Sequence, residues 1–227
     1  TAFDLGAGNG IVSYALAKQG WQVTALEPDP SDYVGAGAIR TIAAAENLAI
    51  EVIEEFGESI PCESDSFDLV MARQVVHHAR DLNQMYAEMS RILKPGGTLI
   101  AFRDHVIDSE DGLKTFQNNH PLHNLYGGEN AFTLAQYVEA IKQAGLNIQK
   151  TLHQFDSVVN YAPKTKQEIS LALASRLRIP LLVGGVTKLL SVEHMSDLML
   201  KTANLAYRKQ GRLVSFICNK PSLLAKT

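Results

Sequence analysis

A glycine-rich turn near the start of the sequence constrains the fold of this chain more than any other feature. Residues 1–5 are apolar and β-prone, and residues 11–18 carry apolar side chains at helical spacing. Between them, residues 6–10 read Gly-Ala-Gly-Asn-Gly. Glycine adopts positive φ angles and has no Cβ to separate the backbone from a ligand, and the start of a helix offers free N–H groups. This strand, turn and helix therefore predict a binding site for a nucleotide-like ligand.

The spacing of the glycines indicates which nucleotide cofactor the turn would hold. A dinucleotide-binding turn reads G-x-G-x-x-G, and its third glycine allows close packing of the helix on the strand. Here Gly6, Gly8 and Gly10 give G-x-G-x-G, and Ile11 occupies the sixth position. The spacing therefore weakens the case for NAD but leaves it open.

An acidic residue follows the second predicted strand. Residues 22–26 are β-prone, and Glu27 comes directly after them, 21 residues beyond Gly6. At this spacing in the dinucleotide fold, a carboxylate accepts hydrogen bonds from the ribose hydroxyls. The alternative is that Glu27 is a solvated carboxylate at the end of a strand.

Four motifs occur in order along the chain. They read FDLGAGNG from residue 3, ALEPD from residue 25, SFDLVMARQVVHH from residue 66 and LKPGGTLIAF from residue 93. In this order they resemble the motifs of class I S-adenosylmethionine-dependent methyltransferases. The resemblance covers residues 1–155 and resumes at the last predicted strand. It implies S-adenosylmethionine as the cofactor and S-adenosylhomocysteine as the product.

The resemblance also implies a set of cofactor-binding residues. The glycine turn and Asp4 would line the methionine and ribose moieties, and Glu27 would hold the ribose hydroxyls. Arg73 and Gln74 follow the fourth predicted strand, whose end lies beside the ligand in open α/β sheets. The full predicted set is Asp4, Gly6, Ala7, Gly8, Asn9, Gly10, Glu27, Pro28, Gly57, Glu58, Arg73 and Gln74. For each glycine the alternative is an ordinary tight turn.

Strands and helices alternate through the first half of the chain, which predicts an α/β fold with a doubly wound, mostly parallel sheet. The predicted strands are residues 1–5, 22–26, 49–55, 67–72, 98–102, 147–155 and 213–219. The predicted helices are residues 11–18, a segment within 31–48, residues 82–93, which Pro-Gly-Gly at 95–97 would end, and residues 132–144. By resemblance the last strand is antiparallel to the others, which gives the seven-stranded, Rossmann-like methyltransferase fold.

A length of 227 residues fits one domain with insertions. We expect residues 1–155 and 211–227 to form the cofactor-binding core. Residues 103–130 are expected to form a substrate lid, and residues 160–210 a helical cap over the active site.

Apolar side chains recur at helical spacing in two runs of the second insertion, residues 166–177 and 192–207. The alternative to a cap is a surface for a homodimer. A lipid-binding surface is a weaker interpretation, because Lys and Arg do not line one face.

The predicted adenine pocket departs from the family pattern. Many relatives place an aspartate after the third strand, where it accepts a hydrogen bond from the adenine amino group, but residues 55–61 contain none. We therefore expect the backbone N–H of Gly57 or Glu58, together with the Glu58 side chain, to contact adenine. A solvated loop charge is the alternative for Glu58.

Two histidines follow the fourth predicted strand. Ligands of open α/β sheets bind outside the carboxyl ends of the strands, which places His77 or His78 near the methyl group that is transferred. A neutral imidazole can accept a proton from a hydroxyl group there. We predict His77 and His78 as catalytic residues. The alternative is that one of them bonds the backbone and shapes the pocket.

The segment after the fifth predicted strand is rich in Asn and Gly and is expected to be a loop at the carboxyl edge of the sheet. Its predicted substrate-binding residues are Arg103, His105, His120, His123 and Tyr126. One alternative is a metal site at His120 and His123, with His105 or Glu129 as a further ligand. We expect no metal, because a loop H-x-x-H lacks the helical frame of H-E-x-x-H. The other alternative is a loop whose polar groups face water.

Composition argues against several classes of partner. A formal charge of −3 and a pI near 6.1 give no basic footprint for nucleic acid. The most apolar run, residues 179–190, contains Pro180 and is too short to cross a bilayer core of about 30 Å. Cys62 and Cys218 lie far apart, which fits unpaired thiols in a reducing compartment. We therefore expect a cytoplasmic protein that binds no nucleic acid and does not span a membrane.

The sequence begins without Met and directly in the first predicted strand. Members of the family usually carry helices before this strand, which help to cover the cofactor. We therefore expect the sequence to be part of a longer chain.

These observations predict a methyltransferase that transfers a methyl group to an oxygen, less readily a nitrogen, of a small-molecule acceptor. Oxygen is favoured because a hydroxyl needs a base, and histidines cluster where one is needed. A NAD-binding oxidoreductase is the alternative enzyme. A catalytically inactive binding or partner protein is the alternative from another class, because a fold alone does not establish function.

Overall fold

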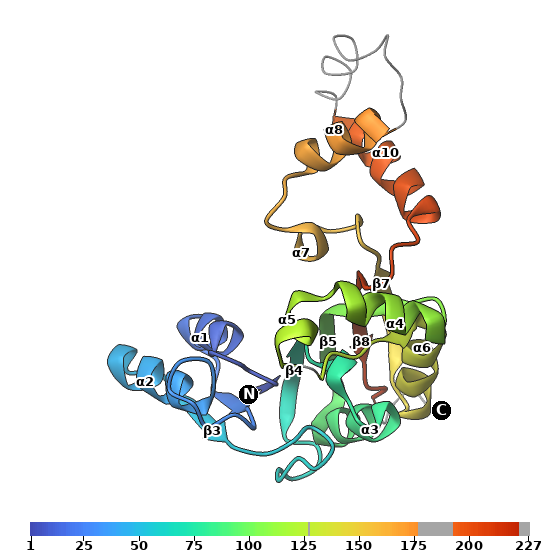
Figure 1. Ribbon diagram of the computed structural model, residues 1–227. Helices are drawn as coiled ribbons and strands as arrows, with labels where there is room; N and C mark the ends of the chain where they lie inside the picture. Colours follow the sequence, from blue (N-terminus) through green and yellow to red (C-terminus); the bar gives the residue numbers. More distant parts are fainter. Residues whose placement is uncertain (127, 177–192, 223–227) are drawn as a thin grey trace.

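The computed structural model describes residues 1–126, 128–176 and 193–222, and a single sheet runs through it (Figure 1). Its strands are β1 (Ala2–Leu5), β2 (Val23–Leu26), β3 (Ile50–Ile53), β4 (Phe67–Arg73), β5 (Leu93–Ile107), β6 (Phe132–Thr133), β7 (Asn147–Leu152) and β8 (Arg212–Asn219). Its helices are α1 (Ile11–Lys18), α2 (Ala36–Glu46), η1 (Val76–His78), α3 (Leu82–Ile92), α4 (Glu110–Asn119), α5 (Pro121–Tyr126), α6 (Leu134–Gln143), α7 (Val158–Tyr161), α8 (Lys166–Arg176) and α10 (Glu193–Ala206).

The strand order places a crevice beside the glycine turn. The order is β3-β2-β1-β4-β5-β8-β7, and β1 pairs in parallel with both β2 and β4. The direction of winding therefore changes at β1, and ligands of such sheets bind at that point, outside the carboxyl ends of the strands. β8 runs antiparallel between β5 and β7. The predicted fold class is confirmed, and only the two-residue β6, which pairs with β5, is an addition to it.

Burial of apolar side chains fixes the strands that carry the site. All of β1 is buried: β2 and β4 pair with its two edges, α1 packs on it, and Phe3 and Leu5 join the core. The rings of Phe3 in β1 and Phe67 in β4 meet edge to face with centroids 5.0 Å apart. α3 buries Tyr86, Met89 and Ile92 at spacings of three and six residues, so one face of that helix joins the same core.

The prediction for residues 95–107 was wrong in its boundaries. β5 runs from Leu93 to Ile107, but Pro95-Gly96-Gly97 interrupts its pairing with β4, since the register passes from Leu93 to Thr98 and Gly96 has a φ of 82°. Gly96 N–H donates to the Lys220 carbonyl and Lys220 N–H to the Gly97 carbonyl, so the chain after β8 pairs with this stretch. The other end of β5 is extended by pairing of residues 104–106 with β8.

The expected loop at residues 103–130 is instead largely helical. After β5 the chain forms α4 and α5. α4 begins at a cap in which the Ser109 side chain accepts a hydrogen bond from Gly112 N–H, and Glu110 and Asp111 occupy the first turn. An acceptor at the cap and negative charge in the first turn both stabilise a helix start. His120 and His123 therefore lie at the end of α4 and within α5, not in an irregular loop.

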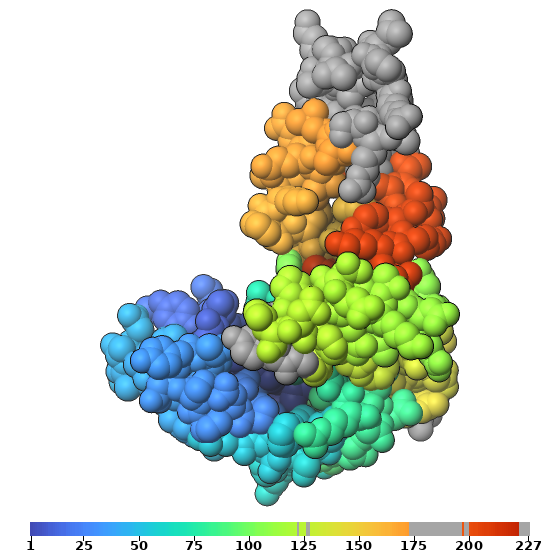
Figure 2. Space-filling model, viewed as in Figure 1, coloured from blue at the N-terminus to red at the C-terminus, as the bar shows by residue number. Residues whose placement is uncertain are grey.

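The segment between β7 and β8 projects from the body of the fold, as Figure 2 shows. α7 packs on β5 and β8, whereas α8 and α10 pack on each other. Lys166 of α8 and Asp197 of α10 form an ion pair. Leu177 and Val192, at the ends of the two predicted helical runs, lie outside the described residues. None of the described helices is both long enough and apolar enough to cross a membrane.

Candidate functional site

The turn between β1 and α1 has a backbone that requires glycine. Gly6, Gly8 and Gly10 have φ angles of 59°, 56° and 82°, in the left-handed region. A Cβ on Gly6 would lie 2.2 Å from Cγ2 of Val75, so the turn sits directly against the segment that follows β4. Gly10 is the N-cap of α1. The local sequence thus produces a tight turn at the point where the winding of the sheet reverses.

Glu27 lies behind this turn and is buried, so the solvated interpretation is wrong. Its side chain is 8% exposed. One carboxylate oxygen accepts the Gly8 N–H at 2.7 Å and the other accepts the Asp29 N–H at 3.0 Å. A carboxylate offers about four lone-pair positions, so both oxygens keep the capacity to accept from ribose hydroxyls. The ribose contact itself stays a prediction.

Two adjoining cavities flank the turn. The cofactor cavity, of about 670 Å³, is lined among the predicted residues by Gly6, Glu27, Pro28, Gly57, Glu58, Gln74 and His78. The histidine cavity, of about 460 Å³, is lined among them by Asp4, Gly6, Ala7, Gly8, Asn9, Arg73, Gln74, His77, His78, His105 and His120. Both volumes fall in the usual range for small-molecule sites. Because Gly6, Gln74 and His78 line both cavities, one extended ligand can occupy the two together.

Asp4 lies at the floor of the histidine cavity. It is buried and accepts a hydrogen bond from the Ser13 hydroxyl of α1 at 2.6 Å. Burial raises the pKa of Asp4 to about 6, because water no longer stabilises the carboxylate. Arg73 lines the same cavity and lowers that pKa in part. The end of the cavity near the turn therefore holds a carboxyl and a guanidinium.

At the predicted adenine end of the cofactor cavity, the Glu58 carboxylate binds the protein backbone and an aromatic ring lines the wall. Oε1 of Glu58 accepts the Arg80 N–H at 2.8 Å, so this carboxylate helps to fix the turn before α3. The Arg80 guanidinium lies over the Phe56 ring, 4.9 Å from its centroid. Phe56 lines the cofactor cavity with half its surface exposed, and the sequence interpretation overlooked it. The sequence did offer a signal for Phe56, namely an aromatic residue directly after the third predicted strand.

His77 is buried and held by Asp104, a residue outside the predicted site. Oδ1 of Asp104 lies 2.9 Å from Nδ1 of His77 and also accepts the backbone N–H of His77 at 3.1 Å. When Asp104 is ionised, Oδ1 accepts the Nδ1–H of His77 as well as the backbone N–H, and Nε2 of His77 keeps its lone pair. Burial lowers the pKa of His77 to about 3 and raises the pKa of Asp104 to about 7. The imidazole is therefore neutral at pH 7.

A row of imidazoles and one carboxylate complete the histidine cavity. The ring of His77 lies 4.1 Å from that of His78 and 4.8 Å from that of His105, and the ring of His105 lies 5.5 Å from that of His120. Oε2 of Glu129 faces Nε2 of His77 at 3.8 Å and Nε2 of His78 at 3.9 Å. Oε1 of Glu129 faces Nδ1 of His120 at 3.7 Å. The sequence considered Glu129 only as a further ligand for His120 and His123.

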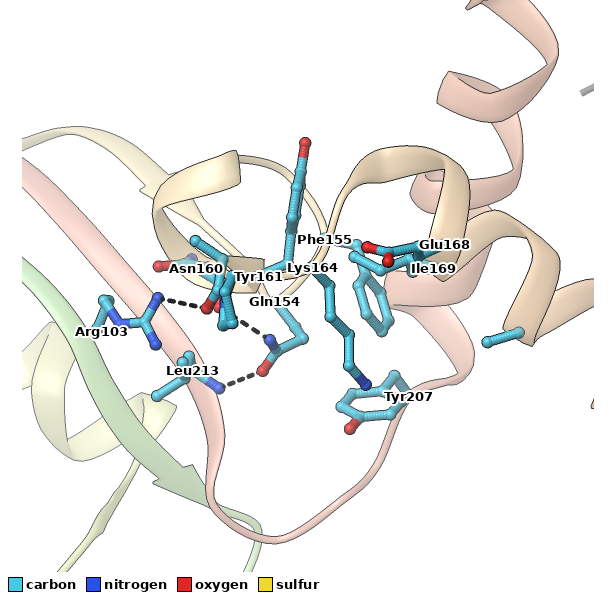
Figure 3. A pocket seen from close by; sticks show the side chains of 13 residues that line it. Arg103, Gln154, Phe155, Asn160, Tyr161, Lys164, Glu168, Ile169, Tyr207 and Leu213 are labelled. Carbon is cyan, nitrogen blue, oxygen red and sulfur yellow. Dashed lines mark hydrogen bonds between the residues drawn. The ribbon is translucent and has the colours of Figure 1, made fainter. Parts of the chain in front are cut away.

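Two of the predicted substrate residues, Arg103 and His123, do not line this cavity. Nη1 of Arg103 donates to the carbonyl oxygens of Val159 at 2.6 Å and Ala162 at 3.3 Å, and Arg103 lines a third cavity of about 550 Å³ with residues of α7 and α8 (Figure 3). His123 lies in α5, and the Tyr126 side chain lies outside what the structure describes. Arg103 is turned away because β5 has a register shift between residues 101 and 104, where Arg103 adopts a φ of 65°.

Comparisons with known proteins agree with the family that the four sequence motifs indicate. Residues 3–101 match the family model described as a methyltransferase domain. The chain is 32% identical over 101 residues to the ubiquinone biosynthesis O-methyltransferase of Methylobacterium sp. (strain 4-46), across 44% of this chain and 39% of that protein. It is 29% identical over 157 residues to the protein of the same name from Methylobacterium nodulans, across 65% of this chain and 60% of that protein. The chain thus spans less than two thirds of each relative.

A solved structure shares the fold. The geranyl diphosphate C-methyltransferase from Streptomyces coelicolor A3(2), crystallised with Mg²⁺, geranyl diphosphate and S-adenosyl-L-homocysteine, matches with a TM-score of 0.65 and 13% identity, over 96% of this chain and 71% of that chain. Residues 3–101 therefore match a methyltransferase domain in sequence, and the chain shares the fold of this solved methyltransferase. The family resemblance of the four sequence motifs is confirmed.

Proposed function

We propose that this chain binds S-adenosylmethionine and transfers its methyl group to an oxygen of a small molecule. The observation that carries the proposal is the position of the glycine turn, with the buried Glu27 carboxylate on one side and a cavity lined by imidazoles on the other. The names of the two Methylobacterium relatives support transfer to oxygen.

The two cavities suggest how the cofactor lies. The adenosine would occupy the cofactor cavity, where Glu27 accepts from the ribose hydroxyls and Gly57 and Glu58 border the base. The methionine would pass over the glycine turn toward Asp4 and Arg73. This arrangement directs the sulfonium methyl group into the histidine cavity, beside Nε2 of His77.

The acceptor would enter the histidine cavity under α4 and α5, which we propose as the lid, with the segment 160–210 as a cap. A neutral Nε2 there can take the proton of an acceptor hydroxyl as the methyl group is transferred. Alignment and exclusion of water supply most of the remaining rate. The location in the cytoplasm and the absence of a nucleic-acid partner stay predictions.

Calorimetry tests the cofactor. The full-length protein is titrated with S-adenosylmethionine, S-adenosylhomocysteine and NADH. We expect the first two to bind and Glu27→Ala to weaken them by about 1.5–3 kcal/mol, the range for a hydrogen bond to a charged group. Glu63→Ala, which removes an exposed carboxylate outside both cavities, is the matched control. Tight NADH binding without S-adenosylmethionine binding would refute the proposal.

A methyl-transfer screen tests the reaction. Small molecules with free hydroxyl or amine groups are incubated with labelled S-adenosylmethionine. The labelled product is then fragmented in a mass spectrometer to find the methylated atom. We expect O-methyl products. A protein that binds the cofactor but methylates nothing across the screen would favour the inactive binding protein instead.

A further inference from the structure

Three side chains at the edge of the histidine cavity have the composition of a metal site. His77, His78 and Glu129 each offer one ligand atom, and these three atoms lie within 4.8 Å of one another. His77 and His78 come from η1, and Glu129 comes from the segment after α5, so the fold brings together residues about 50 positions apart.

The ring of His77 is oriented as a metal ligand is. Its Nδ1 bonds the buried Asp104 carboxyl at 2.9 Å, which leaves the lone pair of Nε2 facing Glu129. Metal-ligating histidines almost always donate the other ring N–H to a carboxylate or carbonyl, which fixes both the tautomer and the ring. Asp104 therefore holds His77 in the geometry that metal binding needs.

Glu129 lines the histidine cavity, and its carboxylate has no hydrogen-bond donor among the described residues. Its side chain is 9% exposed. Among the described residues it accepts no hydrogen bond within the distance limit, and it faces three imidazole nitrogens at 3.7–3.9 Å instead. Burying a carboxylate without hydrogen bonds is costly, so such groups are usually paired or coordinate metals. Nδ1 of His120, which faces Glu129, is also buried without a hydrogen-bond partner in the described chain.

The separations leave room for an ion. Two ligands that are about 2.1 Å from one Zn²⁺ lie about 3.4 Å apart in tetrahedral geometry. The distances from Glu129 to His77 and His78 are 3.8 Å and 3.9 Å, so the groups need to close by roughly half an ångström. His78 is 42% exposed and has space to rotate. The three ligand atoms lie within 4.8 Å of one another, so the widest separation needs a larger closure, which rotation of His78 would supply.

We propose that His77, His78 and Glu129 bind one divalent transition-metal ion of the Zn²⁺ type. The fourth coordination position is open, and His120 lies beside it. Two imidazoles and one carboxylate suit Zn²⁺, Fe²⁺ or Co²⁺, whereas Mg²⁺ and Ca²⁺ prefer oxygen ligands. The imidazole-rich set therefore distinguishes this ion from a magnesium ion.

The role of the ion rests on the proposed function. An acceptor hydroxyl bound at the open position would lose its proton to solvent, because a divalent cation lowers the pKa of a bound hydroxyl. The oxygen then forms a bond to the methyl carbon while the bond from that carbon to sulfur breaks, and S-adenosylhomocysteine leaves. With the ion bound, Nε2 of His77 is a ligand, so water replaces it as the acceptor of the hydroxyl proton.

Metal binding is measured on the full-length protein after removal of metals by chelation. Zn²⁺ and Mg²⁺ are titrated by calorimetry, and Co²⁺ is followed by its visible absorption. We expect one Zn²⁺ or Co²⁺ per chain and no comparable binding of Mg²⁺. Glu129→Gln and His78→Ala should weaken Zn²⁺ binding at least tenfold, and Asp104→Asn about 10- to 100-fold through the orientation of His77.

His153→Ala removes an exposed histidine away from the cavity and is the matched control. Glu129→Gln keeps the shape of the side chain, so a folded variant separates loss of a ligand from loss of structure. No stoichiometric Zn²⁺ or Co²⁺ binding, or binding unchanged in both Glu129→Gln and His78→Ala, would overturn the metal site.

Different experimental results would refute the metal site and the proposed function. Stoichiometric Zn²⁺ binding without S-adenosylmethionine binding would support the site and refute the methyltransferase proposal. Methyl transfer at an undiminished rate by metal-free protein in the presence of a chelator would refute the role of the ion while leaving the methyltransferase proposal in place.

Discussion

At the scale of single residues, the glycine turn depends on a close approach that leaves no room for a side chain. Gly6 has a φ of 59°, and a Cβ there would overlap Val75. We expect Gly6→Ala to lower the free energy of unfolding by on the order of 1–3 kcal/mol, from backbone strain and overlap together. Urea denaturation measures this loss.

Gly20→Ala is the matched control for this substitution. Gly20 also has a positive φ, of 88°, but a Cβ there would meet nothing within 4 Å. The control therefore reports backbone strain without overlap, and its loss should be smaller. Equal losses in the two variants would show that the contact with Val75 is unimportant.

Asp4 makes stability depend on pH. Because burial raises its pKa from 3.8 to about 6, the native state binds more protons than the unfolded state between these pH values. Its contribution is therefore full below pH 3.8 and is lost as the pH rises through about 6. A shift of about two pKa units corresponds to about 3 kcal/mol.

Asp4→Asn removes this titration. We expect the variant to gain up to about 3 kcal/mol over the parent at pH 7.5 and little at pH 4, less any weakening of the bond to Ser13. Urea midpoints at the two pH values measure the difference, with Asp29→Asn, on an exposed residue near the turn, as a control. The same difference at both pH values would contradict the assignment.

The sequence predicted those site residues whose environment is local. The glycines, Asp4 and Glu27 sit at positions where a strand must end and a helix must begin, which spacing reveals. Asp104 was not among the predicted residues, because its partner His77 is 27 residues away and the pairing depends on the register of β4 and β5. Arg103 was placed wrongly for a related reason, since the register shift in β5 turns it toward α7.

At the scale of elements, the start of α4 controls the position of His120 in the histidine cavity. The Ser109 hydroxyl oxygen caps the helix by accepting from Gly112 N–H at 3.2 Å. We expect Ser109→Ala to cost about 1 kcal/mol and to increase hydrogen exchange in the first turn of α4. Ser59→Ala, at an exposed loop serine outside the helices, is the control. Unchanged exchange in α4 would contradict the role of the cap.

The predicted elements were accurate where periodicity alone determines structure. α1 and the strands of the first half match the sequence interpretation within a few residues. β5 was predicted too short, because its second half is extended through pairing with β8, which follows about 100 residues later. No local sequence pattern predicts the pairing of β5 with β8. Gly96 and Gly97, in the first half of β5, read as a turn when the local sequence is considered alone.

At the scale of the whole molecule, the fold separates cofactor binding from the projecting segment. Both cavities are lined by residues of β1, β2, β4 and β5 and of the segments up to Asn130. None of the described residues between 164 and 209 lines either cavity. Asn204 of α10 contacts the segment after β7 by two hydrogen bonds: its side chain accepts the Phe155 N–H and donates to the Asp156 carboxylate.

Replacing residues 164–209 by a flexible Gly-Ser linker should therefore leave cofactor binding intact. The sheet should still fold, because β7 and β8 pair directly and Asn160, which bonds Ser215, is retained. We expect the affinity for S-adenosylmethionine to stay within about twofold of the parent, since a change of that size is about 0.4 kcal/mol. Turnover of the acceptor should fall if the segment covers the active site.

Glu27→Ala in the shortened protein is the control, because it should abolish most of the remaining binding. A shortened protein that is folded by near-ultraviolet circular dichroism but does not bind S-adenosylmethionine would show that the projecting segment belongs to the cofactor site.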